Sequence, residues 1–224
     1  MTDGVSRVTA PDGTALPVRV ESPAGARATL VLAHGAGTSM RHASIVALGE
    51  ALARHRIATV TFDFPYRVRG GGAPDRMPSL VGAYQAVIAA VRAHGASPLF
   101  IGGRSLGGRV ASHVAAAGTA VDGLVFLAFP LHRPGDPGIA RAAHLATIPQ
   151  PMLFVQGTRD TFARWDLLTD VVEALPAATL HAIADGDHGF HVPKRTGRTD
   201  AQVLEEVADV VARWMLAAGT SRCA

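Results

Sequence analysis

The stretch PLFIGGRSLGGR, residues 98–109, predicts the fold of this chain. An apolar run, 99–101, ends at two glycines. Ser105 lies between Gly103 and Gly107, and the alanine-rich segment 110–117 follows at once. That order predicts a strand, a sharp turn and a helix, because only residues without a Cβ let strand and helix pass so close. Ser105 would then project above a sheet edge, beside the backbone N–H of Leu106 at the positive end of the helix. We predict that Ser105 is a nucleophile; a plain loop serine is the alternative.

The composition is that of one domain spanning residues 1–224. With 224 residues, of which 48% are hydrophobic, the chain is long enough for one substantial core and too short for two comfortable domains. The formal charge of +3 comes with no dense basic block, so nucleic acid is not an expected partner. Cys223 is the only cysteine, which excludes a disulfide framework and argues against thiol catalysis. No apolar run reaches about 18 residues and no signal peptide is recognisable, so we expect a cytoplasmic protein that does not enter membranes.

Short apolar runs alternate with segments of helical period over most of the chain. Strands are expected at 5–10, 16–21, 28–33, 57–62, 99–101, 123–129, 152–156 and 179–183. Helices are expected at 40–55, 79–94 with Ser79 as N-cap, 110–117, near 139–145, 166–175 and 200–218, and 63–78 is expected to be loop. The first two strands flank a turn and form an antiparallel hairpin, whereas the others call for a largely parallel sheet of about seven or eight strands with helices on both faces.

A serine hydroxyl needs a base within hydrogen-bond reach and a group that orients the base. His188 follows the last predicted strand in a flexible turn, at the edge where Ser105 should lie. Asp160 follows the strand at 152–156 closely and is assigned as the orienting carboxylate. The chain order of nucleophile, acid and base is the order found in α/β-hydrolases, and not in the other two common folds of serine proteases.

Two backbone donors are expected to hold the negative charge that develops on a carbonyl oxygen. One is the N–H of Leu106 and the other is the N–H of Ala36, which lies in the loop after the strand at 28–33. Losing one such donor typically costs about 10² to 10³ in rate. His34 is interpreted as a structural residue that holds this loop.

Other interpretations of these residues remain open. Asp160 could merely cap the following helix, and Asp136, which trails the previous strand in a proline-rich turn, is the rival acid. His132 reads as a solvated loop histidine that could also line the cleft. Arg104 and Arg109, on either side of the serine turn, either bind an anionic group or form ion-paired scaffold. A further alternative, although its spacing fits no standard zinc signature, is a metal cluster formed by Asp185, Asp187, His188 and His191.

Several motifs together resemble those of a known protein family. They are 34–37 (HGAG), 62–66 (FDFPY), 102–109 (GGRSLGGR), 130–132 (PLH), 156–160 (QGTRD) and 186–188 (GDH). They resemble small, capless α/β-hydrolase-fold proteins related to dienelactone hydrolases, a family that includes the hydrolase-like subunit of a histone-acetyltransferase complex and a testis-expressed protein. The resemblance implies an α/β-hydrolase fold and the triad of Ser105, Asp160 and His188. True dienelactone hydrolases use a cysteine nucleophile, so Ser105 points to ordinary ester or thioester chemistry.

The expected function is a serine hydrolase that needs no cofactor and no metal and acts on a small acyl substrate. Only about 20 residues separate the strands around 129 and 152, which leaves no room for a lid domain. Arg104, His132 and Tyr66 are candidates for lining the substrate site. An acyltransferase, or a catalytically weak or inactive binding or assembly module, is the alternative. The oligomeric state is open, with a homodimer as one option.

Overall fold

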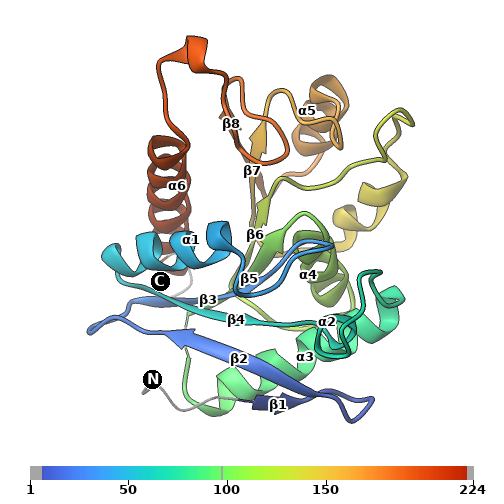
Figure 1. Cartoon of the computed structure of the whole chain (residues 1–224), viewed down its shortest axis with the longest axis vertical. Coiled ribbons are helices and arrows are strands. Elements are labelled where there is room, and N and C mark those ends of the chain that lie inside the picture. Colours follow the sequence, from blue (N-terminus) through green and yellow to red (C-terminus); the bar gives the residue numbers. More distant parts are fainter. Residues whose placement is uncertain (1–6, 97, 221–224) are drawn as a thin grey trace.

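A computed structural model of the chain describes residues 7–96 and 98–220 and shows a single eight-stranded sheet (Figure 1). The strand order is β1-β2-β4-β3-β5-β6-β7-β8, in which β1, β2 and β4 pair antiparallel and every other pair is parallel. The strands are β1 (Arg7–Thr9), β2 (Ala15–Glu21), β3 (Ala28–Ala33), β4 (Ile57–Phe62), β5 (Leu99–Arg104), β6 (Gly123–Leu127), β7 (Met152–Gly157) and β8 (Ala178–Ile183). Five of the inner strands, β3 to β7, are buried almost throughout, which is why they read as continuous apolar runs.

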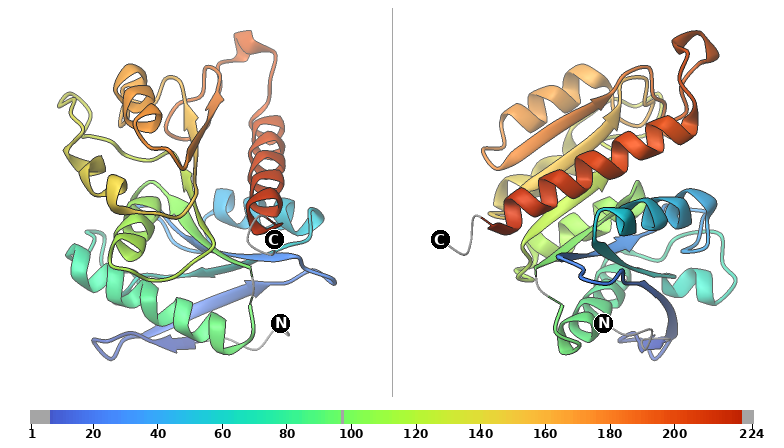
Figure 2. Two further views of the ribbon diagram at one scale, coloured as in Figure 1. Left: turned by 180° about the vertical axis from the view of Figure 1, so that it is seen from behind. Right: turned by 90° about the vertical axis from the view of Figure 1, so that its left-hand side faces the viewer.

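Helices cover both faces of the sheet, as the alternating sequence pattern predicts (Figure 2). One face packs against α1 (Ala43–Arg54) and α6 (Asp200–Thr220), which lie side by side. The opposite face packs against α3 (Met77–Ala93), α4 (Leu106–Ala116) and α5 (Trp165–Glu173). Each apolar helix stripe buries its side chains against one face of the sheet, so two hydrophobic cores result.

The structure corrects three local expectations. The helix expected with Ser79 as N-cap has its N-cap three residues earlier, at Arg76, because Pro78 is accommodated in the first turn, where its missing N–H costs nothing. The segment 63–78 contains a short helix, α2 (Pro65–Val68), rather than loop alone. The helix expected near 139–145 is a 3₁₀ helix, η1 (Ala140–Thr147). Residues 5 and 6 of the predicted first strand lie outside the described residues.

The sheet carries no lid domain. Residues 128–151, which connect β6 to β7, form a loop and η1 and no further domain. A second short 3₁₀ helix, η2 (Lys194–Thr196), precedes α6. Within the described residues, no helix combines the length and the apolar character that a membrane crossing requires. The carboxyl ends of the parallel strands are therefore left accessible from one edge.

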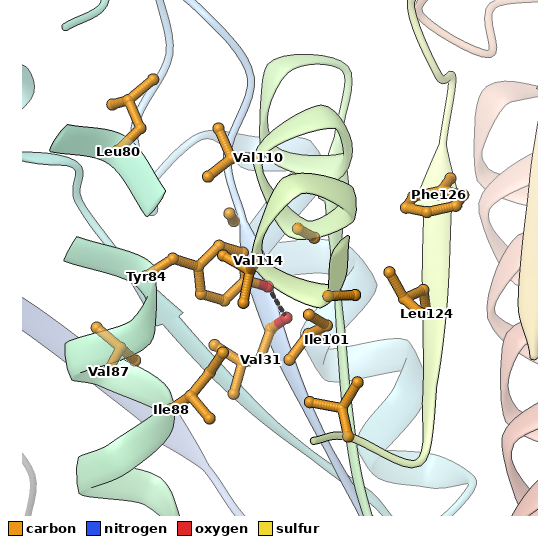
Figure 3. Close-up of a cluster of buried hydrophobic side chains, with 14 of the residues drawn as sticks. Val31, Leu80, Tyr84, Val87, Ile88, Ile101, Val110, Val114, Leu124 and Phe126 are labelled. Carbon is orange, nitrogen blue, oxygen red and sulfur yellow. Dashed lines mark hydrogen bonds between the residues drawn. The ribbon is translucent and has the colours of Figure 1, made fainter. Parts of the chain in front are cut away.

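The side chain of Tyr84 ties α3 to the two central strands (Figure 3). Its hydroxyl oxygen lies 2.5 Å from the carbonyl oxygen of Val31 in β3 and 2.7 Å from that of Gly102 in β5, and it accepts the N–H of Gly102 at 3.0 Å. The residue is fully buried, and burial raises its pKa, so the hydroxyl keeps its proton. Tyr84 thus supplies polar partners to the backbone of Val31 and of Gly102, which lies three residues before Ser105.

Replacing Tyr84 with Phe should therefore destabilise the protein, although the ring and its packing are retained. The loss of the hydroxyl leaves buried backbone atoms without a partner, for which we expect a cost of about 1 to 3 kcal/mol in the free energy of unfolding. Urea denaturation of wild type and Tyr84→Phe measures this difference. Equal midpoints and slopes for the two proteins would show that the hydroxyl contributes nothing to stability.

Two stacked histidines join α4 to η1. The rings of His113 and His144 lie 3.9 Å apart and nearly parallel, and His144 Nε2 lies 2.7 Å from the hydroxyl oxygen of Ser112. Ser112 in turn donates to the carbonyl oxygen of Arg109. Burial, with the neighbouring His113 and the Arg109 charge, lowers the pKa of His144 to about 4, so the stack is held together by a neutral imidazole.

Acid should therefore weaken this contact. In the unfolded chain His144 takes up a proton near pH 6.5, whereas in the folded chain it does so only near pH 4. The contribution of neutral His144 to the free energy of unfolding is therefore fully present above pH 6.5 and is lost as the pH falls from 6.5 to 4. We expect His144→Gln, which retains a donor for Ser112, to lose less stability than wild type from pH 7 to pH 4. Denaturation midpoints across this range provide the measurement, and parallel curves would contradict the assignment.

Candidate active site

Ser105 occupies a strained turn between β5 and α4. Its backbone has a φ of 51° and a ψ of −112°, a conformation that L-residues avoid. A Cβ placed on Gly107 would lie 2.3 Å from the carbonyl oxygen of Ala33, and one on Gly103 would lie 2.6 Å from the same atom. The N–H of Ser105 donates to the carbonyl oxygen of Leu127 at 2.9 Å, which fixes the turn to β6. The glycines around the serine are therefore a steric requirement, as the sequence predicts.

Ser105, His188 and Asp160 form one continuous chain of hydrogen bonds. The hydroxyl of Ser105 lies 2.9 Å from Nε2 of His188, and Nδ1 of His188 lies 2.7 Å from Oδ2 of Asp160. With the imidazole proton on Nδ1, that nitrogen donates to the carboxylate and Nε2 accepts from the hydroxyl. The fold brings together three residues that lie far apart in the sequence, at the carboxyl ends of their strands.

The carboxylate of Asp160 is buried and fully engaged. Its Oδ1 accepts the N–H of Phe162 at 2.8 Å, and its Oδ2 accepts the side-chain amide of Gln156 at 2.6 Å as well as the imidazole. Both Asp160 and Gln156 are almost completely buried. The sequence analysis assigned no role to Gln156. The feature that could have identified it is its polar side chain near the end of an otherwise apolar strand, four residues before Asp160.

Three contacts hold the turn that carries His188. The carboxylate of Asp187 accepts the N–H groups of Gly189 and His191, which closes the turn on itself. Arg104 donates from Nη2 to the carbonyl oxygen of His188 at 3.0 Å. The ring of Phe162 lies 4.4 Å from the imidazole, centroid to centroid. These contacts restrict the position of His188, and neither Phe162 nor Asp187 was singled out for such a role from the sequence.

The loop at 34–37 packs directly beside the serine. A Cβ placed on Gly35 would lie 3.7 Å from the Cβ of Ser105. His34 is fully buried and accepts the N–H of Phe64 through Nε2, which fits the structural role predicted for it. Burial lowers the pKa of His34 and keeps it neutral, as an acceptor must be. In the described part of the chain, the N–H groups of Ala36 and Leu106 have no hydrogen-bond partner.

The structure shows the surroundings of the three candidate substrate-lining residues. Tyr66 is buried and packs edge-on against His34, so its ring contacts the loop at 34–37. His132 is buried as well, not solvated, because Nδ1 bonds to the carbonyl oxygen of Arg133 and Nε2 accepts the N–H of Arg164. Arg104 faces a largely apolar cavity of about 320 Å³ between α1, α6 and Phe190, where it also donates to Ser44.

The rival assignments do not assemble in the same way. Asp136 lies in an exposed turn that lines a different cavity, and no contact joins it to His188. The carboxylate of Asp187 serves its own turn, whereas Asp185 pairs with Arg195 and His191 with Asp200. Within residues 7–96 and 98–220, no group of three or more His, Cys, Asp or Glu side chains is arranged to hold a metal ion.

Comparison with known proteins places the chain in a family. Residues 26–216 match the model of the alpha/beta hydrolase domain family. The chain belongs to this alpha/beta hydrolase family. Among similar solved structures are an alpha-beta serine hydrolase homologue from Coxiella burnetii (21% identity, 95% of this chain and 97% of that chain, TM-score 0.75), an alpha/beta serine hydrolase without lid from Xanthomonas campestris (23%, 93% and 93%, 0.69) and a dienelactone hydrolase from Anabaena variabilis (20%, 94% and 94%, 0.70). The resemblance to capless relatives of dienelactone hydrolases is thereby confirmed.

The contact between β7 and the His188 turn gives a test of this geometry. A Cβ on Gly157 would lie 2.4 Å from the carbonyl oxygen of Gly186 and 2.6 Å from that of Asp187. We expect Gly157→Ala to push the turn away and to break the bond between His188 and Asp160. The measurement is the low-field proton signal of the His188 Nδ1–H, together with the melting temperature.

A matched control is Gly72→Ala, because a Cβ at Gly72 meets nothing within 4 Å. The control should retain the low-field signal and the wild-type melting temperature. An unchanged signal in Gly157→Ala would show that the close approach of these two loops does not hold the imidazole in place.

Proposed function

We propose that this protein is a serine hydrolase that cleaves carboxylic ester or thioester bonds through an acyl-enzyme intermediate. The observation that carries the proposal is the unbroken chain from the Ser105 hydroxyl through His188 to the carboxylate of Asp160, at 2.9 and 2.7 Å. Both separations lie within the reach that nucleophile activation requires. The likeness to serine hydrolases and esterases is consistent with this reading, but the proposal rests on the geometry.

Acylation begins when His188 Nε2 takes the proton of the Ser105 hydroxyl while the oxygen attacks an acyl carbonyl carbon. The buried carboxylate of Asp160 stabilises the imidazolium that forms and keeps Nδ1 protonated in the resting state. Gln156 and the N–H of Phe162 hold that carboxylate in place. The imidazolium then gives its proton to the departing alcohol or thiol, and the acyl group remains on Ser105.

The N–H groups of Ala36 and Leu106 stabilise the tetrahedral oxyanion. The first belongs to the loop that packs beside the serine, and the second lies at the first position of α4, where the helix dipole is positive. Water, deprotonated by the same His188, then attacks the acyl-enzyme and releases the acid. No cofactor takes part in this scheme.

The missing lid favours small or extended acyl groups over long buried chains. Ser105 and Leu106 are half-buried at an edge that no additional domain covers. A non-catalytic assembly module would be expected to hold the serine out of reach of the base, and the 2.9 Å separation argues against that alternative. An acyltransferase would form the same acyl-enzyme and differ only in the acceptor, so product analysis with and without added alcohol distinguishes the two.

Labelling with a fluorophosphonate probe tests the nucleophile. We expect the probe to modify wild type at Ser105 and to leave Ser105→Ala unmodified, because the probe requires an activated serine. Mass spectrometry of the tryptic peptides identifies the modified residue. If wild type stays unlabelled under conditions that label a known serine esterase, the proposed function is wrong.

Substitution of the carboxylate tests the role of Asp160. Asp160→Asn retains the size of the side chain but favours the wrong tautomer of His188, and we expect kcat for a 4-nitrophenyl ester to fall by about 10⁴. Asp170→Asn, an exposed carboxylate on α5, is the matched control and should retain wild-type kcat. A loss of less than tenfold in Asp160→Asn would remove Asp160 from the mechanism.

A further inference from the structure

The two arginines that flank the serine turn have different surroundings. Arg104 is committed to the scaffold, since it donates to Ser44 from Nη1 and to the carbonyl oxygen of His188 from Nη2. It also lies over the ring of Phe190 at 5.8 Å and senses the charges of Asp187 and Asp160. Its charge is therefore used to hold the turn that carries His188. The sequence left both arginines open between scaffold and ligand binding, and the structure settles Arg104 as scaffold.

Arg109 has no such partner. In the described part of the chain it forms no ion pair and its guanidinium makes no hydrogen bond, although its Nε is buried. Burial, together with the charge of a second cation, Arg141, lowers the pKa of Arg109. A half-buried cation without a counter-charge is costly, and an anion supplied from outside would remove this cost.

Arg109 and Arg141 line one cavity together with a third arginine, Arg133. It has a volume of about 400 Å³, lies between the first turn of α4 and the segment 131–141, and is lined by Arg109, Arg133 and Arg141 together with Leu131, His132, Asp136, Pro137, Gly138 and Ala140. Arg141 donates to the carbonyl oxygen of His132, which orients it along the wall. Within the described residues, Asp136 is the one carboxylate of this lining, and it forms no ion pair with the arginines.

The lining of this cavity is connected to the nucleophile turn by backbone hydrogen bonds. Arg109 follows Ser105 by one helical turn, and its N–H donates to the carbonyl oxygen of Ser105 at 3.1 Å. On the other side, the N–H of the wall residue His132 donates to the carbonyl oxygen of Phe162, whose ring packs on His188. Two residues of the cavity lining are thus bonded directly to Ser105 and to the residue that packs on His188.

We propose that this cavity binds an anionic group of the substrate, a carboxylate or a phosphate, while Ser105 attacks an acyl carbonyl elsewhere in the same molecule. The inference rests on the proposed function and adds the class of substrate to it. Guanidinium groups recognise carboxylate and phosphate oxygens through paired N–H donors, and three of them around one cavity exceed the single negative charge of Asp136. The preferred substrates are thus small esters or thioesters with a second, negatively charged end.

Pairs of esters in which a free carboxylate is compared with its methyl ester provide the test. One pair is mono-4-nitrophenyl glutarate and its methyl ester, with the charge on the acyl part; the other is 4-butyryloxybenzoate and its methyl ester, with the charge on the leaving group. We expect wild type to favour the anionic member of at least one pair by about tenfold or more in kcat/KM, which corresponds to one charge-assisted hydrogen bond. Inhibition of wild type by inorganic phosphate and by glutarate, measured separately, shows which of the two anions the cavity prefers.

Variants of the cavity should change this preference in opposite directions. Arg109→Gln should reduce the ratio of kcat/KM for the anionic and neutral esters towards one, Arg109→Lys should restore part of it, and Asp136→Asn should raise it. Arg92→Gln removes an exposed arginine from α3 and is the matched control, with an unchanged ratio. Should Arg109→Gln fold poorly, Arg133→Gln, at an exposed position, takes its place.

The outcomes separate this inference from the function on which it rests. Hydrolysis of the neutral esters without preference for either anionic partner would overturn the anion site and leave the hydrolase intact. A preference that survives Arg109→Gln and Arg133→Gln would also overturn it. Failure to turn over any of the four esters, together with absence of fluorophosphonate labelling, would instead refute the hydrolase itself.

Discussion

The close approach of β3, β5 and α4 leaves no space for a side chain at Gly103 or Gly107, and the site depends on this contact. Both α-carbons face the carbonyl oxygen of Ala33, at distances that any Cβ would violate. Because α4 starts so close to β3, the chain must turn sharply at Ser105, which accounts for its positive φ. The same closeness places the loop at 34–37 beside the serine. One steric constraint thus fixes the hydroxyl and both backbone donors relative to one another.

A second close approach places the acid and the base. Gly157 at the end of β7 lies against the carbonyl oxygens of Gly186 and Asp187, so the loop with Asp160 and the turn with His188 touch through their backbones. Hydrogen bonds from the side chains of Gln156 and Arg104 and from the backbone N–H of Phe162 further restrict these two residues. Groups held in this way need little reorganisation when charge develops, which is the condition for electrostatic stabilisation of a transition state. Both halves of the site are thus positioned by backbone contacts.

Most of the fold could be predicted from the sequence because its signals are local. Buried parallel strands appear as apolar runs. The glycines around Ser105 indicate a close backbone contact even when the segment they contact is not known. Because Ser105, Asp160 and His188 each follow a predicted strand, their order also indicates that they meet at one edge of the sheet. The start of α3 was misplaced because Pro78 fits the first turn as well as Ser79 fits an N-cap. The burial of Tyr66 and His132 depends on loops that pack from elsewhere in the chain, and no local pattern reports it.

The different fates of the two arginines show what the motif cannot express. Arg104 ends β5 and reaches the face covered by α1 and α6, where the His188 turn and Ser44 supply acceptors. Arg109 lies one turn into α4, on the opposite face, beside a proline-rich segment that contributes two more arginines and one carboxylate. Both arginines lie within four residues of Ser105 in the sequence, but the sheet separates the two charges. Arg104 is hydrogen-bonded to the scaffold, and in the described residues Arg109 faces a cavity with an excess of positive charge, so an electrostatic preference for anions follows from the topology.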